Sequence, residues 1–515
     1  MRQAAYSVTT DAPTLDFPNG EDKPSGNDSS DKEISSIRDL EDFAQMEIDV
    51  DEVTLELITN YNYKVVLVST GPQVNVFPAY QSGSVYLTDP DVANHQARGG
   101  TVVCDELCVY VPSYPPPPCS IAQDPNNLTI TNLQNYFIFE GKSAGAGQLR
   151  VEIRNPVGMA VTNDAAKVQI QDIKSLYERA RAINVTSGKP PSDLVSQCSG
   201  ISTTPGMPNE TEQVIIFVHG INNTVWDYEN SSETMSKRLY WAGYHGRFAA
   251  FRWPCAYLWP TTWNPFQFNK GEFYAWKSAT ALKDYLTYLM SRPDLAGYAI
   301  DILAHSQGNI VASEAIVQGA TFDNYILTQG AVPTHCYDTN APSLQKLLDA
   351  DVIRHTPFNA VNGGYHGYFA DLQGNLVNFY NTNDFALAKG VTTILGIPKE
   401  TNWEENQRTQ KPEDFFGGPS YSYDPYTQTS TAYYTFGSHY TVTDSQEIKS
   451  MVARSRSAAV GAQGGLGGVI GSSVDLQTSF TFGKTRAEHS AQFTRPIQSA
   501  LGYYQIVLIK TQPAP

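Results

Sequence analysis

The feature that most constrains this sequence is a serine placed between an apolar strand and a helix. Residues 298–306 (YAIDILAHS) read as a buried strand, and residues 308–320 (GNIVASEAIVQGA) carry the apolar pattern of a helix. Ala304-His305-Ser306-Gln307-Gly308 between them is a Gly-x-Ser-x-Gly elbow with alanine in the first position. Small residues are needed two positions either side of the serine because strand and helix crowd together there. We predict that Ser306 is an exposed nucleophile facing the positive end of the helix.

A second segment fits the same chemistry. Residues 214–218 predict a buried strand that runs into His219-Gly220-Ile221-Asn222. A backbone N–H just after such a His-Gly pair supplies one donor of an oxyanion hole, and the residue after the nucleophile supplies the other. We predict Ile221 and Gln307 as these donors, with Asn222 as the alternative to Ile221. The competing interpretation is that His219-Gly220 forms a plain turn.

The pattern of apolar and polar residues changes near residue 212. From there on, apolar strands alternate with amphipathic helices, which predicts a mainly parallel sheet flanked by helices. Earlier residues read as short strands between turns, as in a β-sandwich, followed by a predicted helix over 169–183. We therefore divide the chain into four parts: an acidic leader (1–45), a β-rich accessory domain (46–185), a linker (186–211) and an α/β domain (212–515).

The α/β part resembles the α/β-hydrolase superfamily. The stretches that carry the resemblance are VHGINNT, FRWP, LAHSQGN and YNTNDFAL. They are similar to lipases and to a bacterial hydrolase family that opens with Val-His-Gly-aromatic-Asn-Asn, although Ala304 replaces a glycine and Ile221 an aromatic residue. The resemblance implies an α/β-hydrolase fold and a Ser-His-acid triad that needs no metal or organic cofactor.

In this superfamily the acid follows the nucleophile along the chain, and the histidine follows the acid. Asp384 comes directly after the predicted strand in NLVNFYNTN, at the position where the acid is expected. Asp323 and Asp338 lie nearer the preceding strand and are the alternatives.

Two of the nine histidines, His439 and His489, follow Asp384. His489 stands between the extended run VDLQTSFTF and a helix expected from about Pro496, which is where the superfamily keeps its base. We therefore predict His489 as the base, with His439 as the alternative.

Aromatic residues crowd the end of the predicted strand GRFAAFRWP and the segment after it, among them Trp253, Trp259 and Trp263. One interpretation makes them the apolar wall of a substrate site. The other makes them ordinary core packing.

The net charge of the chain limits the classes of partner that it can bind. A net charge of −17 argues against nucleic acid and anionic membrane surfaces, and the first sixty residues hold fifteen Asp or Glu against four Lys or Arg. Asp28, Asp31 and Asp39 are close enough in sequence to hold a structural calcium ion, but they lack the Asp-x-Asp-x-Asp-Gly loop, so a solvated leader is the preferred interpretation. The partner we expect is an ester, small or polymeric.

The cysteines and the hydropathy pattern give little information about the compartment in which the protein is located. Cys104, Cys108 and Cys119 are close enough in sequence for a disulfide to form among them. The competing interpretation is a zinc site, but no fourth ligand lies at a suitable spacing. No apolar run approaches the roughly 18 residues that span a bilayer, and the opening residues show no signal peptide. The segment IRDLEDFAQMEIDV and the β-rich region after it are similar to parts of large secreted bacterial proteins, so we expect a secreted or cell-surface bacterial protein.

These observations favour a serine hydrolase of carboxylic esters, a carboxylesterase or lipase. The rival from another class is a surface or adhesion protein that uses the hydrolase fold as a binding scaffold without turnover. Among enzymes, cleavage of amides or thioesters is the alternative, because the same residues serve all three reactions.

Overall fold

The computed structural model describes, with short gaps, residues 44–47, 63–78, 136–182, 196–255, 265–332, 369–387, 391–400, 420–442, 459–476 and 489–511, and a few single residues. The chain divides into two compact units. One contains residues 1–176, 233–243 and 492–504, and the other contains residues 177–232, 244–491 and 505–515.

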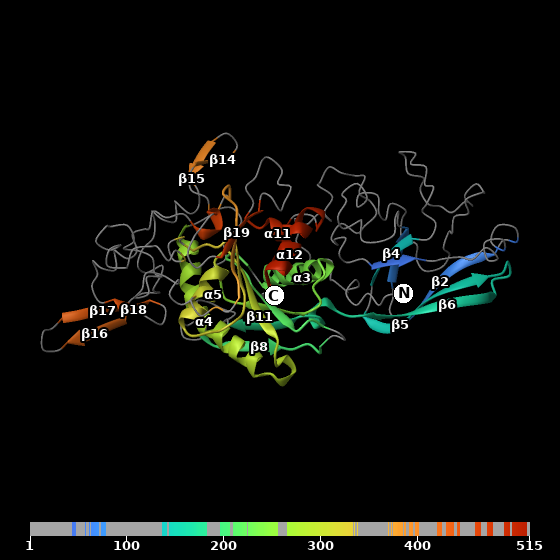
Figure 1. Cartoon of the computed structure of the whole chain (residues 1–515), viewed down its shortest axis with the longest axis horizontal. Coiled ribbons are helices and arrows are strands. Elements are labelled where there is room, and N and C mark those ends of the chain that lie inside the picture. Colours follow the sequence, from blue (N-terminus) through green and yellow to red (C-terminus); the bar gives the residue numbers. More distant parts are fainter. Residues whose placement is uncertain are drawn as a thin grey trace. The chain divides into compact units, whose positions relative to one another are not determined.

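The second unit is built on an eight-stranded sheet with the order β19-β13-β12-β11-β9-β10-β7-β8 (Figure 1). Every neighbouring pair is parallel except β7 and β8. A parallel sheet is covered on both faces, so its strands are continuously apolar; all six residues of β9 are buried. The strands are β7 (Glu178–Ala182), β8 (Cys198–Ser202), β9 (Gln213–Val218), β10 (Arg247–Arg252), β11 (Ala299–His305), β12 (Tyr325–Thr328), β13 (Leu376–Tyr380) and β19 (Ser472–Asp475).

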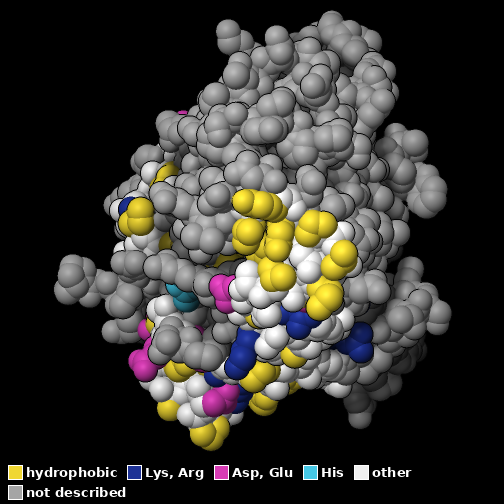
Figure 2. Space-filling view, turned by 90° about the vertical axis from the view of Figure 1, so that its right-hand side faces the viewer, with side chains coloured by type: hydrophobic (Ala, Val, Ile, Leu, Met, Phe, Trp, Pro, Cys, Tyr) yellow, Lys and Arg dark blue, Asp and Glu magenta, His cyan; other side chains and the backbone are white. Residues whose placement is uncertain are grey.

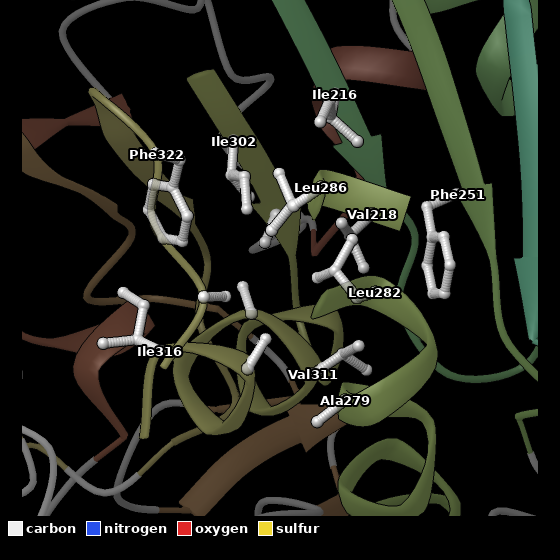
Figure 3. Close-up of a cluster of buried hydrophobic side chains, with 14 of the residues drawn as sticks. Ile216, Val218, Phe251, Ala279, Leu282, Leu286, Ile302, Val311, Ile316 and Phe322 are labelled. Carbon is white, nitrogen blue, oxygen red and sulfur yellow. The ribbon is translucent and has the colours of Figure 1, made fainter. Parts of the chain in front are cut away.

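Two helices pack against one face of this sheet. Side chains at alternate positions of β9, β10 and β11 meet those of α4 (Pro265–Ser291) and α5 (Gly308–Val317), as Figure 3 shows. Each fully buried aliphatic side chain contributes roughly 1.5–3 kcal/mol, so this core holds the β11–α5 turn firmly against the sheet. The core residues labelled in Figure 3 are Ile216, Val218, Phe251, Ala279, Leu282, Leu286, Ile302, Val311, Ile316 and Phe322.

The other helices of the described chain are α3 (Val225–Trp241), α11 (Ala491–Thr494) and α12 (Ile497–Thr511). The α3 helix begins against the sheet, where the Tyr228 hydroxyl donates to the carbonyl of Ala250 in β10 at 3.0 Å. None of the helices in the described residues is long and apolar enough to cross a membrane.

Strand order places the two predicted loops together. From β9 the chain passes to β10 on one side, whereas β11 lies on the other side of β9. Ligands of such sheets bind at this reversal, outside the carboxyl ends of the strands. Val218 pairs with Ala304, so His219-Gly220 and His305-Ser306 leave the sheet side by side.

The predicted helix over residues 169–183 is wrong. The chain there forms the end of β6, a single turn at Ile173–Ser175, and then β7. Glu178, Ala180 and Ala182 are buried while the arginines between them are not, which is the two-residue period of a strand. Because β7 and β8 belong to the eight-stranded sheet, that sheet begins near residue 178, inside the region assigned to the accessory domain and linker.

The N-terminal part contains two three-stranded antiparallel sheets, in agreement with the predicted β-rich region. Their orders are β1-β4-β3 and β2-β5-β6. The strands are β1 (Ala44–Glu47), β2 (Lys64–Thr70), β3 (Val74–Pro78), β4 (Tyr136–Gly141), β5 (Gly145–Arg154) and β6 (Ala160–Ile170).

The β5–β6 hairpin presents apolar side chains to solvent. Val157 is 80% exposed, Met159 65% and Val161 50%. Figure 2 shows hydrophobic side chains gathered on one face of the molecule. The first six residues of β6, an edge strand of the sheet β2-β5-β6, are exposed on both sides of the strand.

Small antiparallel ribbons lie between β13 and β19 in the sequence and were not expected. One pairs β14 (Val391–Ile394) with β15 (Ile397–Glu400). The other contains β16 (Ser420–Asp424), β17 (Thr429–Phe436) and β18 (Tyr440–Val442).

A buried carboxylate ties the amino ends of the central strands to the C-terminal helix. Asp301 of β11 accepts hydrogen bonds from the Gln213 side chain (2.5 Å) and from the backbone and side-chain nitrogens of Asn324 (3.0 and 2.7 Å). Both amide side chains also donate to the carbonyl of Thr511, at 3.1 Å each. Burial outweighs these bonds and raises the pKa of Asp301 to about 6.

Stability should therefore rise as the pH falls through 6. Folded Asp301 binds its proton near pH 6, whereas the unfolded residue binds it near pH 4, so its contribution is complete below the unfolded pKa and lost as the pH rises through the folded one. Between pH 7 and pH 5 this group should add about 1 kcal/mol to the free energy of unfolding. Urea titrations at pH 5, 6 and 7 should show a flatter profile for Asp301→Asn than for wild type and for the control Asp164→Asn, which replaces an exposed carboxylate. Equal slopes in all three proteins would contradict this role.

Candidate active site

The backbone of Ser306 adopts a conformation that non-glycine residues rarely take. Its φ is 52°, in the left-handed region. Its N–H donates to the Thr328 carbonyl at 3.1 Å, and its own carbonyl accepts from Ala331 N (3.1 Å) and from the Asn309 side chain (3.0 Å). Neighbouring elements therefore hold the strained turn that places the serine just beyond the end of β11. Ser306 is only 1% exposed, so the prediction of an exposed nucleophile is wrong.

Two glycines let the loops after β9 and β11 touch. A methyl group on Gly308 would overlap the Val218 carbonyl oxygen and lie 2.5 Å from that of His219. A methyl group on Gly220 would lie 2.8 Å from the Ser306 Cβ. The contacts at Gly308 give the physical reason for a small residue two positions after the serine. The matching requirement at Gly220 was not predicted.

His489 contacts the serine directly. Its Nε2 lies 2.8 Å from Ser306 Oγ, and its Nδ1 lies 2.7 Å from Asp384 Oδ2. An ionised carboxylate can only accept, so Nδ1 carries the proton and donates it to Asp384. The Nε2 lone pair is then free to accept the hydroxyl proton of Ser306. The structure brings together the three residues predicted as nucleophile, base and acid.

Asp384 is fully buried, and its two oxygens accept four hydrogen bonds. Oδ1 accepts from the backbone N–H groups of Ala386 (2.8 Å) and Leu387 (3.2 Å). Oδ2 accepts from His489 and from the side chain of Gln329, which is 2.7 Å away. Gln329 was missed; the signal available in the sequence was its position directly after the strand that became β12, at the same edge of the sheet as Ser306.

The loop after β9 is held by its own side chains. The Asn223 side chain donates to the carbonyls of Gly220 (3.1 Å) and Ile221 (2.9 Å). A planar trans peptide points its N–H opposite to its C=O, so these bonds also fix the directions of the Ile221 and Asn222 N–H groups. Asn222 has a φ of 63°, a conformation that asparagine tolerates better than most residues. The side chain of Ile221 packs with Ala331, Ala386, Leu387, Ala459 and Ala462, beside the segments that carry the acid.

His219 and Trp253 hold the same loop through hydrogen bonds and ring stacking. Trp253 N donates to His219 Nε2 (3.1 Å), so the other ring nitrogen, Nδ1, carries the proton and donates to the Gly220 carbonyl (2.8 Å). Burial lowers the pKa of His219 to about 3, so the ring stays neutral. The indole of Trp253 stacks on it at 5.3 Å and donates to the His219 carbonyl. Trp253 is buried in the core, which contradicts its place in a substrate wall.

Cys255 closes the loop on its other side. Its sulfur accepts from Asn223 N at 3.2 Å and donates to Asn223 O at 3.1 Å. Burial raises the pKa of this thiol to about 11, so it remains protonated and keeps both bonds at neutral pH.

The remaining predicted residues fall into two groups. Asp323 accepts from the N–H of Ile300 at 2.7 Å, at the amino end of β11, about 20 Å along the strand from Ser306, so it is not the acid. No group of three or more metal-ligating side chains occurs in the part of the chain that the structure describes. Outside that part lie the alternatives Asp338 and His439, the tryptophans Trp259 and Trp263, the candidate calcium ligands Asp28, Asp31 and Asp39, and the cysteines Cys104, Cys108 and Cys119.

Residues 206–336 match the family described as "Alpha/beta hydrolase of unknown function (DUF900)". The match includes both loops that meet at Ser306 and ends before Asp384 and His489. No curated protein matched the chain. The matched residues form the centre of the parallel sheet, so family and architecture agree with the predicted α/β-hydrolase fold.

Adding a methyl group at Gly308 should destabilise this α/β domain. The new Cβ would meet two backbone carbonyls that cannot rotate away, which should cost about 1–3 kcal/mol. Thermal unfolding of Gly308→Ala should begin several degrees below that of wild type. Gly471→Ala is the matched control, because its Cβ would meet nothing closer than 3.7 Å. Identical melting temperatures for the two variants would rule out the close contact.

Proposed function

We propose that this chain is a serine hydrolase that cleaves carboxylic esters. The observation that carries the proposal is the continuous hydrogen-bonded series from Asp384 through His489 to Ser306, with contacts of 2.7 and 2.8 Å. The family match over residues 206–336 supports hydrolase chemistry in general and leaves the substrate open.

Each residue has a role that its bonds favour. Ser306 Oγ attacks the ester carbonyl as His489 Nε2 takes its proton, which produces a tetrahedral oxyanion and an imidazolium. Asp384 orients the ring through Nδ1 and stabilises the cation. His489 then returns the proton to the departing alcohol, and an acyl-enzyme remains. Water, deprotonated by the same nitrogen, attacks the acyl group and releases Ser306.

The oxyanion needs donors that are already in place before it forms. We assign this role to the backbone N–H groups of Ile221 and Gln307, with Asn222 as the alternative to Ile221. Two features support the assignment. The carbonyls of Gly220 and Ile221 are held by side chains of their own loop, and Gln307 is the N-cap residue directly before α5.

Esters are proposed over amides because an alcohol leaves more readily than an amine and needs less help from a single acid. Thioesters remain an alternative within the same mechanism. The competing proposal from another class is a binding scaffold without turnover. The hydrogen bonds that join Ser306, His489 and Asp384 argue against it. A scaffold gains nothing from a buried aspartate that holds one histidine tautomer against a serine.

The first test is hydrolysis of p-nitrophenyl esters from acetate to palmitate. Ser306→Ala and His489→Ala should each lower kcat by at least about 10³-fold, because these residues act as one unit. Asp384→Asn should also lose most activity, because its amide would favour the wrong histidine tautomer.

His439→Ala is the control for the base. Loss of activity in that variant with His489→Ala still active would show that the base is wrongly assigned. A wild-type protein that hydrolyses no ester, thioester or amide and takes up no fluorophosphonate would favour the scaffold.

The side chain of Asn223 should affect turnover more than binding. Asn223→Asp keeps the shape but replaces the donor with an oxygen that repels both carbonyls, so the N–H groups of the loop should lose their direction. We expect kcat to fall by about 10²-fold, as on loss of one oxyanion donor, with KM changed by less than about threefold. The kcat of Asn223→Ala should also fall, but by a smaller factor. Wild-type kcat in both variants would show that the loop needs no such support.

A further inference from the structure

The side chain of His305, the residue before the nucleophile, points at the main chain of the base. Its Nε2 lies 2.7 Å from the carbonyl oxygen of His489, although 184 positions separate the two residues. Their rings lie 4.9 Å apart, centroid to centroid. His305 therefore meets His489 through both its backbone and its ring.

The direction of this hydrogen bond is fixed. A carbonyl oxygen can only accept, so His305 Nε2 carries a proton and donates it. Burial, together with the nearby His489, lowers the pKa of His305 to about 3, and the imidazole stays neutral while the base works. A neutral donor does not compete with His489 for protons.

The space for this ring is built into the neighbouring loop. His305 is only 6% exposed, and a methyl group on Gly220 would lie 3.0 Å from His305 Nδ1. The absence of a side chain at Gly220 thus makes room for His305 as well as for Ser306. The end of β11 carries both the nucleophile and the group that contacts the base.

From this geometry we propose that His305 is a positioning residue: it ties the backbone of His489 to the strand that carries Ser306. The inference rests on the proposed function, because it assumes that His489 is the working base. Asp384 orients the His489 ring from one side through Nδ1, and His305 restrains the backbone behind that ring. Together they keep Nε2 within reach of Ser306 Oγ.

Two amide substitutions separate this role from general packing. The side-chain nitrogen of glutamine reaches about as far as His Nε2, whereas that of asparagine stops one methylene short. His305→Gln should keep the bond to the His489 carbonyl, and His305→Asn should lose it. Both side chains are neutral and polar, so the pair differs mainly in reach.

Ester kinetics should be normalised to the fraction of protein that a fluorophosphonate can label and followed beside thermal unfolding. We expect His305→Asn to lower kcat by about 10- to 100-fold with little change in KM, because small misplacements of a catalytic group cost that much. His305→Gln should stay within about threefold of wild type. Equal kcat in wild type and His305→Asn, or equal losses in both variants, would overturn the proposal.

A second readout does not depend on turnover. The proton shared by His489 Nδ1 and Asp384 should give a far-downfield proton NMR signal, absent in His489→Ala. This signal should persist in His305→Gln and shift or broaden in His305→Asn; an unchanged signal in His305→Asn would count against the proposal. If wild type shows the signal but hydrolyses no acyl substrate, the proposed function fails while the positioning inference is still decided by NMR.

Discussion

The pairing of β9 with β11 is the contact on which the rest of the site depends. Val218 lies opposite Ala304, and the chain continues from each strand into a loop that carries part of the chemistry. Parallel neighbours lie about 4.8 Å apart, which leaves no room for side chains where the loops and the α5 helix converge. Gly220 and Gly308 occupy those points. The strained φ of Ser306 is tolerated because the strands, held by a large apolar core, do not move to relieve it.

Among the residues that the structure describes, three histidines lie at this edge of the sheet, and the partners of their ring nitrogens distinguish them. In His219 one nitrogen accepts from the Trp253 backbone and the other donates to the Gly220 carbonyl, so the ring is a structural link. In His305 one nitrogen donates to a backbone carbonyl. Only His489 places one nitrogen on a carboxylate and the other on a serine hydroxyl. Burial keeps the first two neutral, so neither carries a charge beside the developing imidazolium.

The sequence predicted those parts of the site that depend on local pattern. Ser306 and Ile221 each follow a continuous apolar strand, and strand ends meet at one edge of a parallel sheet, so these positions could be read from periodicity. Asp384 and His489 needed the order of residues known for the resembled superfamily, because their approach to Ser306 spans long stretches of chain. Gln329, Asn223 and His305 were missed as contributors since a hydrogen bond between distant segments leaves no periodic trace. The helix expected over residues 169–183 failed because its composition suits a helix, whereas a free sheet edge beside β10 captured residues 178–182 as a strand.

The base is the part of the site that most needs external support. Ser306 is fixed by the strand that precedes it and the helix that follows, but His489 lies in a short irregular segment just before α11 (Ala491–Thr494). A side chain on such a segment gains precision only from bonds made to rigid elements. Asp384 and His305 provide them, from the ends of β13 and β11, and they contact different atoms of the same residue. Ring and backbone are thus restrained separately, and the strands that carry the acid and the nucleophile determine the position of the base.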